Sequence, residues 1–178
     1  GNQENKLNSH QIEYQHKFFD FWLFDLKGKL GKNKLSTENS NNRNYNINLK
    51  EISPKISYLL NKDNRLSVFY ELKNKENQLA DFESLNHQKI GVDYFYSKAK
   101  QQFSANFTSF FNNFEGDTNS PVAYQMLEGL QAGRNFTWNL FFNQKLNSFL
   151  NLNLSYLGRK SENSRTIHTG NVQLRAIF

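Results

Sequence analysis

The sequence predicts an all-β fold: an antiparallel up-and-down transmembrane β-barrel, of which this chain supplies about nine strands. Three observations predict it. Apolar and polar residues alternate in segments along the whole chain, the connections between segments alternate between short and long, and the last segment ends on Phe178. Successive side chains of a strand point to opposite faces, so each segment has one apolar and one polar face. A membrane barrel needs both faces, because lipid lies outside it and a polar interior lies inside.

The composition fits this class and excludes others. Only 37% of the 178 residues are hydrophobic and the mean hydropathy is -0.78, yet 15% are aromatic, which argues against disorder. The absence of cysteine excludes disulfides, thiolate zinc sites and a cysteine nucleophile. No apolar run approaches the ~20 residues of a membrane helix. We expect residues 1–178 to form a single domain.

Alternation with a period of two defines nine segments. In chain order they are residues 12–18, 22–30, 45–58, 66–72, 90–96, 103–111, 136–142, 150–156 and 172–178. Five apolar residues fall on the polar faces of their segments: Phe69, Phe95, Phe110, Phe141 and Ile177.

The first connection is predicted at residues 19–21, although it lacks Gly, Pro and Asn. A three-residue turn pairs Phe18 with Trp22 and keeps both aromatic rings on the apolar face. The alternative is one unbroken strand over residues 12–30, which would place Asp20 in lipid near the middle of the membrane at a high cost.

The third segment changes phase. Tyr45, Ile47 and Leu49 occupy odd positions, whereas Ile52, Pro54, Ile56 and Tyr58 occupy even ones. One extra residue in a strand produces such a shift, so a β-bulge is predicted at Lys50–Glu51. A proline is tolerated next to a bulge.

The connections are sorted by parity along the chain. Short ones are predicted at 19–21, 61–64, 98–101 and 147–148, and long ones at 31–44, 74–86, 112–134 and 158–169. Short turns on one side and long loops on the other are typical of outer-membrane barrels. Greek-key connections of a sandwich have no reason to sort in this way.

Several blocks resemble the carboxy-terminal region of large, poorly characterised outer-membrane β-barrel proteins from Bacteroidota. They are 42–47 (NRNYNI), 51–56 (EISPKI), 126–138 (MLEGLQAGRNFTW), 158–162 (GRKSE) and 167–178 (IHTGNVQLRAIF). The resemblance implies a location in the bacterial outer membrane and a barrel with more strands than this chain contains. It implies no catalytic residue.

Two groups of site residues follow. The expected lipid-facing residues are Trp22, Phe107, Trp138, Leu152 and Leu154, with Asn106, Asn139, Asn151 and Asn153 facing the interior. Val172, Leu174 and Phe178 look like the signal that the barrel-assembly machinery reads on a final strand. The net charge of +6, spread over strands and loops, favours a lipopolysaccharide leaflet as the partner rather than nucleic acid.

The remaining candidates have ordinary interpretations. His10, His16, His87 and His168 show no metal-ligand spacing, so no metal or other cofactor is expected. Glu115, Asp117, Glu128 and Glu162 lie in predicted long loops and are expected to face solvent or bridge divalent ions. Residues 121–133 are too apolar to lie free in water, so they either extend strands or pack inside the mouth, where gating or ligand contact is the second possibility.

The predicted function is a non-enzymatic outer-membrane β-barrel acting as a pore, a secretion or assembly component, or a scaffold. The alternatives are a surface-exposed all-β glycan-binding module and a barrel enzyme with carboxylates in its loops. A single-chain barrel has an even number of strands, and nine is odd. We therefore expect the first and last strands to pair with further strands, from the same or another chain, rather than with each other.

Overall fold

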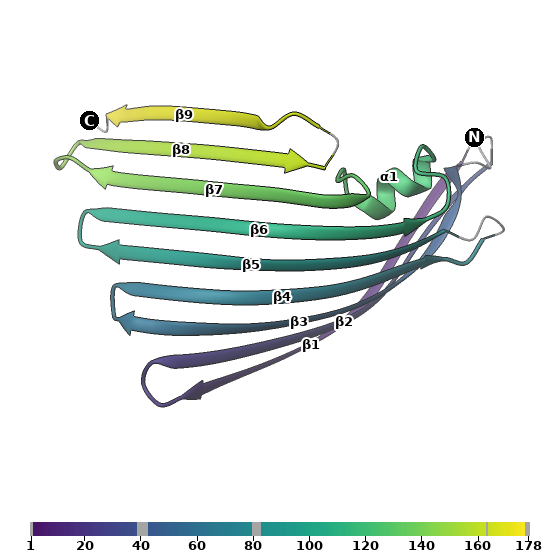
Figure 1. Cartoon of the computed structure of the whole chain (residues 1–178), viewed down its shortest axis with the longest axis horizontal. Helices are drawn as coiled ribbons and strands as arrows, with labels where there is room; N and C mark the ends of the chain where they lie inside the picture. Colours follow the sequence, from purple (N-terminus) through teal and green to yellow (C-terminus); the bar gives the residue numbers. More distant parts are fainter. Residues whose placement is uncertain (1, 39–42, 80–82, 163, 177–178) are drawn as a thin grey trace.

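The structure is a computed structural model that describes residues 2–38, 43–79, 83–162 and 164–176. Its nine strands form one antiparallel sheet in chain order, and one short helix lies between the sixth and seventh (Figure 1). The elements are β1 (Gln3–Phe18), β2 (Trp22–Thr37), β3 (Tyr45–Asn61), β4 (Asn64–Asn77), β5 (Ser84–Lys98), β6 (Gln101–Glu115), α1 (Pro121–Leu127), β7 (Gly133–Lys145), β8 (Leu150–Ser161) and β9 (Ile167–Ala176).

The predicted all-β, up-and-down sheet of nine strands is confirmed, but the sheet is open. Among the described residues, β1 pairs only with β2 and β9 only with β8. We expected that the first and last strands would not pair with each other, and β1, including His10, is indeed not hydrogen-bonded to β9. Phe178 and Ile177 lie outside the described residues.

The strands are longer than the apolar alternation predicted. β1 begins at Gln3 rather than at residue 12, and β2 continues to Thr37 through a stretch that was predicted as a loop. Apart from Leu7 and Leu35, these extensions carry Gly or polar side chains, so they show no alternation, although their pairing continues the sheet. The long connections shrink accordingly, from 31–44 to 38–44 for example.

The sorting of the connections is confirmed: the short turns lie at one end of the sheet and the long loops at the other (Figure 1). The turn at residues 19–21 is also confirmed, since Phe18 pairs with Trp22 across it. Phe19 adopts φ 54°, the left-handed conformation that lets the chain reverse without glycine.

The predicted bulge at Lys50–Glu51 is wrong. Pairing with β2 continues without a shift through both residues, and the irregularity in β3 lies instead between Leu59 and Asn61, beside the short turn. The sequence changes phase because the apolar residues change faces. Tyr45 and Ile47 point into the concave side, where α1 covers them, whereas Ile52 and Ile56 point outward.

The strands are staggered. One ladder row crosses the whole sheet through Phe18, Trp22, Tyr58, Leu66, Tyr94, Ala105, Leu140, Tyr156 and Gly170. This row meets β1 at its last residue. It meets β3 three residues before the end of that strand, β5 four residues before its end, and β7 five residues before its end. Such a stagger tilts the strands relative to the axis about which the sheet curves.

Candidate functional site

The two faces of the sheet differ in burial, and the difference is the reverse of the usual one: the polar face is buried and the apolar face is exposed. Ser57, Ser67 and Thr108 point to the concave side and are 1%, 1% and 3% exposed. Ile56, Val68 and Phe107, their neighbours in sequence, point to the convex side and are 46%, 43% and 50% exposed. Curvature crowds the concave side chains together and separates the convex ones.

Helix α1 lies inside the concave side at the long-loop end (Figure 1). Its start is specified locally: the Ser120 hydroxyl accepts a hydrogen bond from the Ala123 amide at 2.9 Å, and Pro121 occupies the first turn. Its end is specified by Glu128 and Gly129, both with positive φ. Ser120 also donates to Glu83 Oε1 at 2.6 Å, which ties the helix start to the segment preceding β5.

The apolar side of α1 closes a small core against the sheet. The buried residues of this core are Tyr45, Ile47, Leu85, Val122, Met126 and Leu127, with Leu35 and Phe114 packed against them. Of the two structures expected for residues 121–133, strand extension or inward packing, α1 therefore adopts inward packing, against the concave face of the sheet. The second expected role, gating or ligand contact, stays a prediction.

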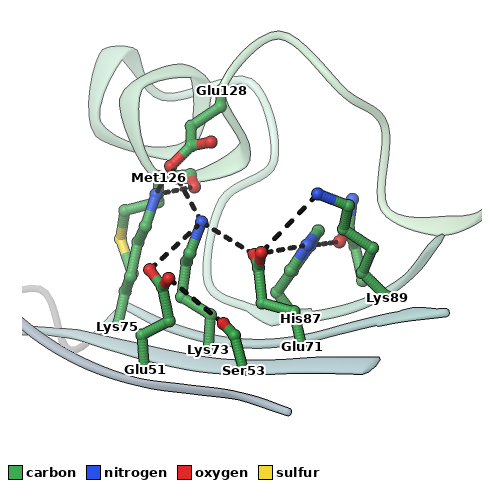
Figure 2. Close-up of polar contacts among 10 residues, drawn as sticks. Glu51, Ser53, Glu71, Lys73, Lys75, His87, Lys89, Met126 and Glu128 are labelled. Atoms are coloured by element: carbon green, nitrogen blue, oxygen red, sulfur yellow. Dashed lines mark hydrogen bonds and ion pairs between the residues drawn. The ribbon is translucent and has the colours of Figure 1, made fainter. Parts of the chain in front are cut away.

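Beside this core lies an ionic cluster formed by Glu51, Glu71, Lys73, Lys75, His87, Lys89 and Glu128 (Figure 2). Lys75 joins it to the helix: its ammonium donates to Met126 O at 2.7 Å and to Glu128 Oε1 at 2.6 Å. Lys73 contacts three carboxylates, those of Glu71, Glu51 and Glu128, at 3.1, 3.8 and 3.7 Å.

The second half of the cluster centres on Glu71. Its carboxylate lies 3.5 Å from Lys89 Nζ and 3.7 Å from His87 Nε2 (Figure 2). On the other side of the ring, His87 Nδ1 lies 2.5 Å from Asn112 Oδ1. With three carboxylates and three ammonium groups, the cluster is balanced when His87 is neutral. Burial disfavours charge on Glu128, but the bond from Lys75 and the charge of Lys73 hold the pKa of its carboxyl below the usual value.

A second polar chain crosses the middle of the concave face. Lys55 donates to Asp93 at 3.2 Å, Asn106 donates to the other Asp93 oxygen at 2.5 Å, and Thr108 donates to Asn106 at 3.1 Å. A groove of about 520 Å³ runs beside this chain toward β1, with Asp25 and Lys27 among its lining residues. The arrangement can hydrate and orient a polar solute.

Phe69 and Phe110, two of the aromatic residues that interrupt the predicted alternation, lie on this concave face and make specific contacts there. Lys89 Nζ lies 5.3 Å from the ring centre of Phe69 and 5.8 Å from that of Phe110. The Phe69 ring also fills the space above Gly91, where a β-carbon would lie 2.3 Å from it. Cation–π contacts and glycine packing therefore keep these rings on the polar face.

Every expected lipid-facing residue lies on the convex face. Trp22, Phe107 and Leu154 are 36%, 50% and 36% exposed, and Trp138 and Leu152 are half-buried. Trp138 is covered in part because its ring lies over Gly158 of the paired strand β8.

The residues expected to face the interior, Asn106, Asn139, Asn151 and Asn153, have the opposite parity and lie on the concave face. Of the expected assembly signal, Val172 and Leu174 are strongly exposed on the convex side of β9. Phe178 falls outside the described residues.

The loop carboxylates are engaged in local contacts. Glu162 accepts from the Arg134 amide, Glu115 from Ser84, and Asp117 from the Asn119 amide. Glu128 is exposed to solvent, as expected, and it also joins the ionic cluster. Within the described residues, no group of three or more His, Asp or Glu side chains is placed to hold a metal ion.

Of the ionic cluster, sequence reasoning singled out His87 and Glu128 but connected neither of them to the other members. One signal was available, since Glu71, Lys73, His87 and Lys89 share the polar parity of adjacent strands. The partners of α1 had no such signal, because Lys75 and Glu128 are 53 residues apart.

Comparison of the chain with models of known protein families and with curated proteins found no match. In the described part of the chain, no helix has the length and apolar character needed to cross a bilayer.

Proposed function

We propose that this chain forms part of the wall of an integral outer-membrane β-barrel. Its convex face contacts lipid, and its concave face lines a polar lumen that α1 narrows. The observation that carries the proposal is the inverted burial of the sheet, with serines buried beside exposed isoleucine, valine and phenylalanine. In water, apolar surface costs about 25 cal/mol per Å², and soluble monomers rarely expose a large contiguous apolar patch.

The stagger of the strands supports the same proposal, because a closed barrel requires tilted strands. Lipid also requires both edges of the sheet to be paired, since each unsatisfied backbone group there costs several kcal/mol. β1 and β9 run in the same direction, as the first and last of nine antiparallel strands do. Antiparallel closure therefore takes an odd number of additional strands from the same or another chain.

The activity that we propose for this lumen is the passage of small polar solutes, and we propose no catalytic reaction. Its walls present hydrogen-bonding and charged groups, and α1 with the ionic cluster leaves the long-loop mouth restricted. Secretion or assembly work and a purely structural role are the other functions that this wall would serve. Val172 and Leu174 on β9 remain the proposed contact of the barrel-assembly machinery.

Tryptophan quenching tests the placement in lipid. The chain has two tryptophans, Trp22 and Trp138, and both lie on the convex face. In liposomes whose acyl chains carry bromine, we expect strong quenching of both. The Trp22→Phe variant, which leaves Trp138 near the middle of β7, should be quenched best by bromine deep in the bilayer.

The alternatives predict different results. A surface-exposed glycan-binding module would stay soluble without detergent, and its tryptophans would be insensitive to brominated lipid. A barrel enzyme would show the quenching but also turn over a glycan or lipid, and would stop doing so in Glu128→Ala, Glu162→Ala or His168→Ala variants.

A further inference from the structure

Four lysines form a basic patch on the convex face at the long-loop end of β1, β2 and β3: Lys6, Lys32, Lys34 and Lys50. In β2 the alternation is clear, because Lys32 and Lys34 are exposed while the residues between and after them, Asn33 and Leu35, are half-buried toward the concave side. The patch is therefore presented away from the lumen.

The lysines of this basic patch are crowded. Lys6 lies directly opposite Lys34 in the β1–β2 register, and Lys32 and Lys50 lie on the same face of adjacent strands. Like charges directly opposite each other across strands destabilise a sheet. Glu4 pairs with Lys6 at 2.7 Å. Among the described residues, no carboxylate lies within 4.0 Å of the other three ammonium groups. Glu76 shares this face on β4, opposite Asn48, and Glu38 lies at the same end beside Asn2. The four lysines therefore exceed Glu4, Glu38 and Glu76 by one positive charge, which an external anion can offset.

The basic patch lies immediately beside the apolar part of the convex face. Leu30 is the next convex residue of β2 after Lys32, and Ile52 is the next of β3 after Lys50; they are 59% and 48% exposed. Two residues along a strand span roughly 7 Å. At the short-turn end the same strands carry Phe18, Trp22 and Tyr58 on this face instead. Positive charge next to an apolar band at this end of the three strands fits an anionic group at the edge of a hydrocarbon layer.

We propose that the basic patch binds the phosphate groups of a phosphorylated glycolipid in the outer leaflet, with the acyl chains of that lipid lying against Leu30 and Ile52. This rests on the proposed function, because it requires the convex face to contact lipid. Lysine ammonium groups act as point-charge ligands for phosphate.

The test uses the full chain in detergent micelles, titrated with bis-phosphorylated lipid A or with the same lipid after removal of both phosphates. We expect tight binding of the first only. The double variant Lys32→Gln/Lys34→Gln should bind it about 25-fold more weakly, taking about 1 kcal/mol for each lysine. The matched control is Lys62→Gln in the short turn at the opposite end, which should bind normally.

A second readout has the opposite sign. Without lipid A, the double variant should be as stable as the parent chain or more stable, because the Lys6–Lys34 repulsion is gone; with lipid A its Tm should rise less. Equal binding of the dephosphorylated lipid, equal losses in Lys62→Gln, or full competition by millimolar inorganic phosphate or by single-stranded DNA would overturn the proposal. If brominated lipid quenches the tryptophans in either case, the membrane placement stands and only the lipid site fails.

Discussion

The convex and concave faces of this sheet are made by alternate residues of the same strands, yet they are stabilised in different ways. Concave polar groups find partners within the protein: the Ser57 and Ser67 hydroxyls lie 2.8 Å apart on adjacent strands, and Asp93 accepts from both Lys55 and Asn106. Convex side chains such as Ile56 and Phe107 lie open. The difference teaches that the chain encloses its polar groups and leaves its apolar groups to be covered by the surroundings.

The concave face itself divides into two parts. Its middle is an open groove, whereas its long-loop end is covered by α1, which brings both an apolar core and the ionic cluster. Apolar packing holds the helix against the wall, and the contacts of Lys75 with Met126 O and Glu128 orient its end. These two faces and two parts give four predictions, from the largest expected effect to the smallest.

The comparison of faces predicts the largest effect. Leu154 and Asn153 are neighbours in β8 but face opposite sides. If the convex face contacts lipid as proposed, Leu154→Arg should destabilise the protein in liposomes by about 2–4 kcal/mol, because it would place a charge in the hydrocarbon near mid-membrane. Asn153→Arg should be tolerated, because Asn153 lies on the concave face. Folding into liposomes, followed by urea titration, measures both. Equal tolerance of the two substitutions would end the membrane interpretation of the convex face.

How much of this was predictable differs between the faces. The convex face follows from a period of two, and Trp22, Phe107, Trp138, Leu152 and Leu154 all fall on it, because alternation is a local property of the backbone. The all-β class, the strand order and the parity of the connections follow from the same pattern. Strand ends were underestimated because hydrogen-bonded extensions with polar residues on both faces leave no alternation to read.

The concave face was predicted only as polar. The ionic cluster joins residues from β3, β4 and β5 with Glu128 beyond α1, so it depends on strand register and on where a loop folds back. The phase change of the apolar residues in β3 indicates that Tyr45 and Ile47 face inward, whereas from the sequence alone it is interpreted as a bulge. Tyr45 and Ile47 face inward because a helix covers them, and the short helix gave no periodic signal of its own.

The second prediction tests the link between the cluster and the helix. Lys75→Met should loosen α1 by about 1–3 kcal/mol, because it removes the bonds to Met126 O and Glu128 and leaves those acceptors without their donor. Tyr124 is exposed on α1, and the chain has no cysteine, so a spin label on Tyr124→Cys reports helix mobility directly. Lys55→Met, which loses the Asp93 contact in the middle of the face, is the matched control. A mobile label in the control, or an immobile one in Lys75→Met, would contradict the link.

The third prediction concerns the start of the helix. Ser120→Ala should destabilise α1 by about 1 kcal/mol, since it removes both the cap on the Ala123 amide and the hydrogen bond to Glu83. The same label at position 124 measures it. Asn119→Ala, an exposed neighbouring change, should stay within about 0.5 kcal/mol of the parent. If the two variants behave alike, the cap does not contribute to holding the helix in the mouth.

The smallest effect is a pH dependence of the same contact. Glu128 has a pKa below its usual value in the folded chain despite burial, because Lys75 and then Lys73 stabilise its carboxylate. A lowered folded-state pKa means that the contribution to stability is fully present above the unfolded value of about 4.5 and is lost as the pH falls through the folded value. The label at position 124 should therefore be immobile and insensitive to pH above about 5, and become mobile as the pH falls below 4.5. The Glu128 side chain is 59% exposed, so solvent screening keeps the effect modest.

Other ionisable groups lie near Glu128, and two variants separate their effects from that of Glu128. Glu51, Glu71 and His87 face Lys73 or each other within the cluster. Glu128→Gln should remove the low-pH transition of the label while leaving a helix that is somewhat looser at every pH, because an amide cannot supply the charge that Lys75 and Lys73 attract. His87→Gln should leave the transition below 4.5 in place. A transition that disappears in His87→Gln would instead assign the pH sensitivity of α1 to His87 and its contact with Glu71.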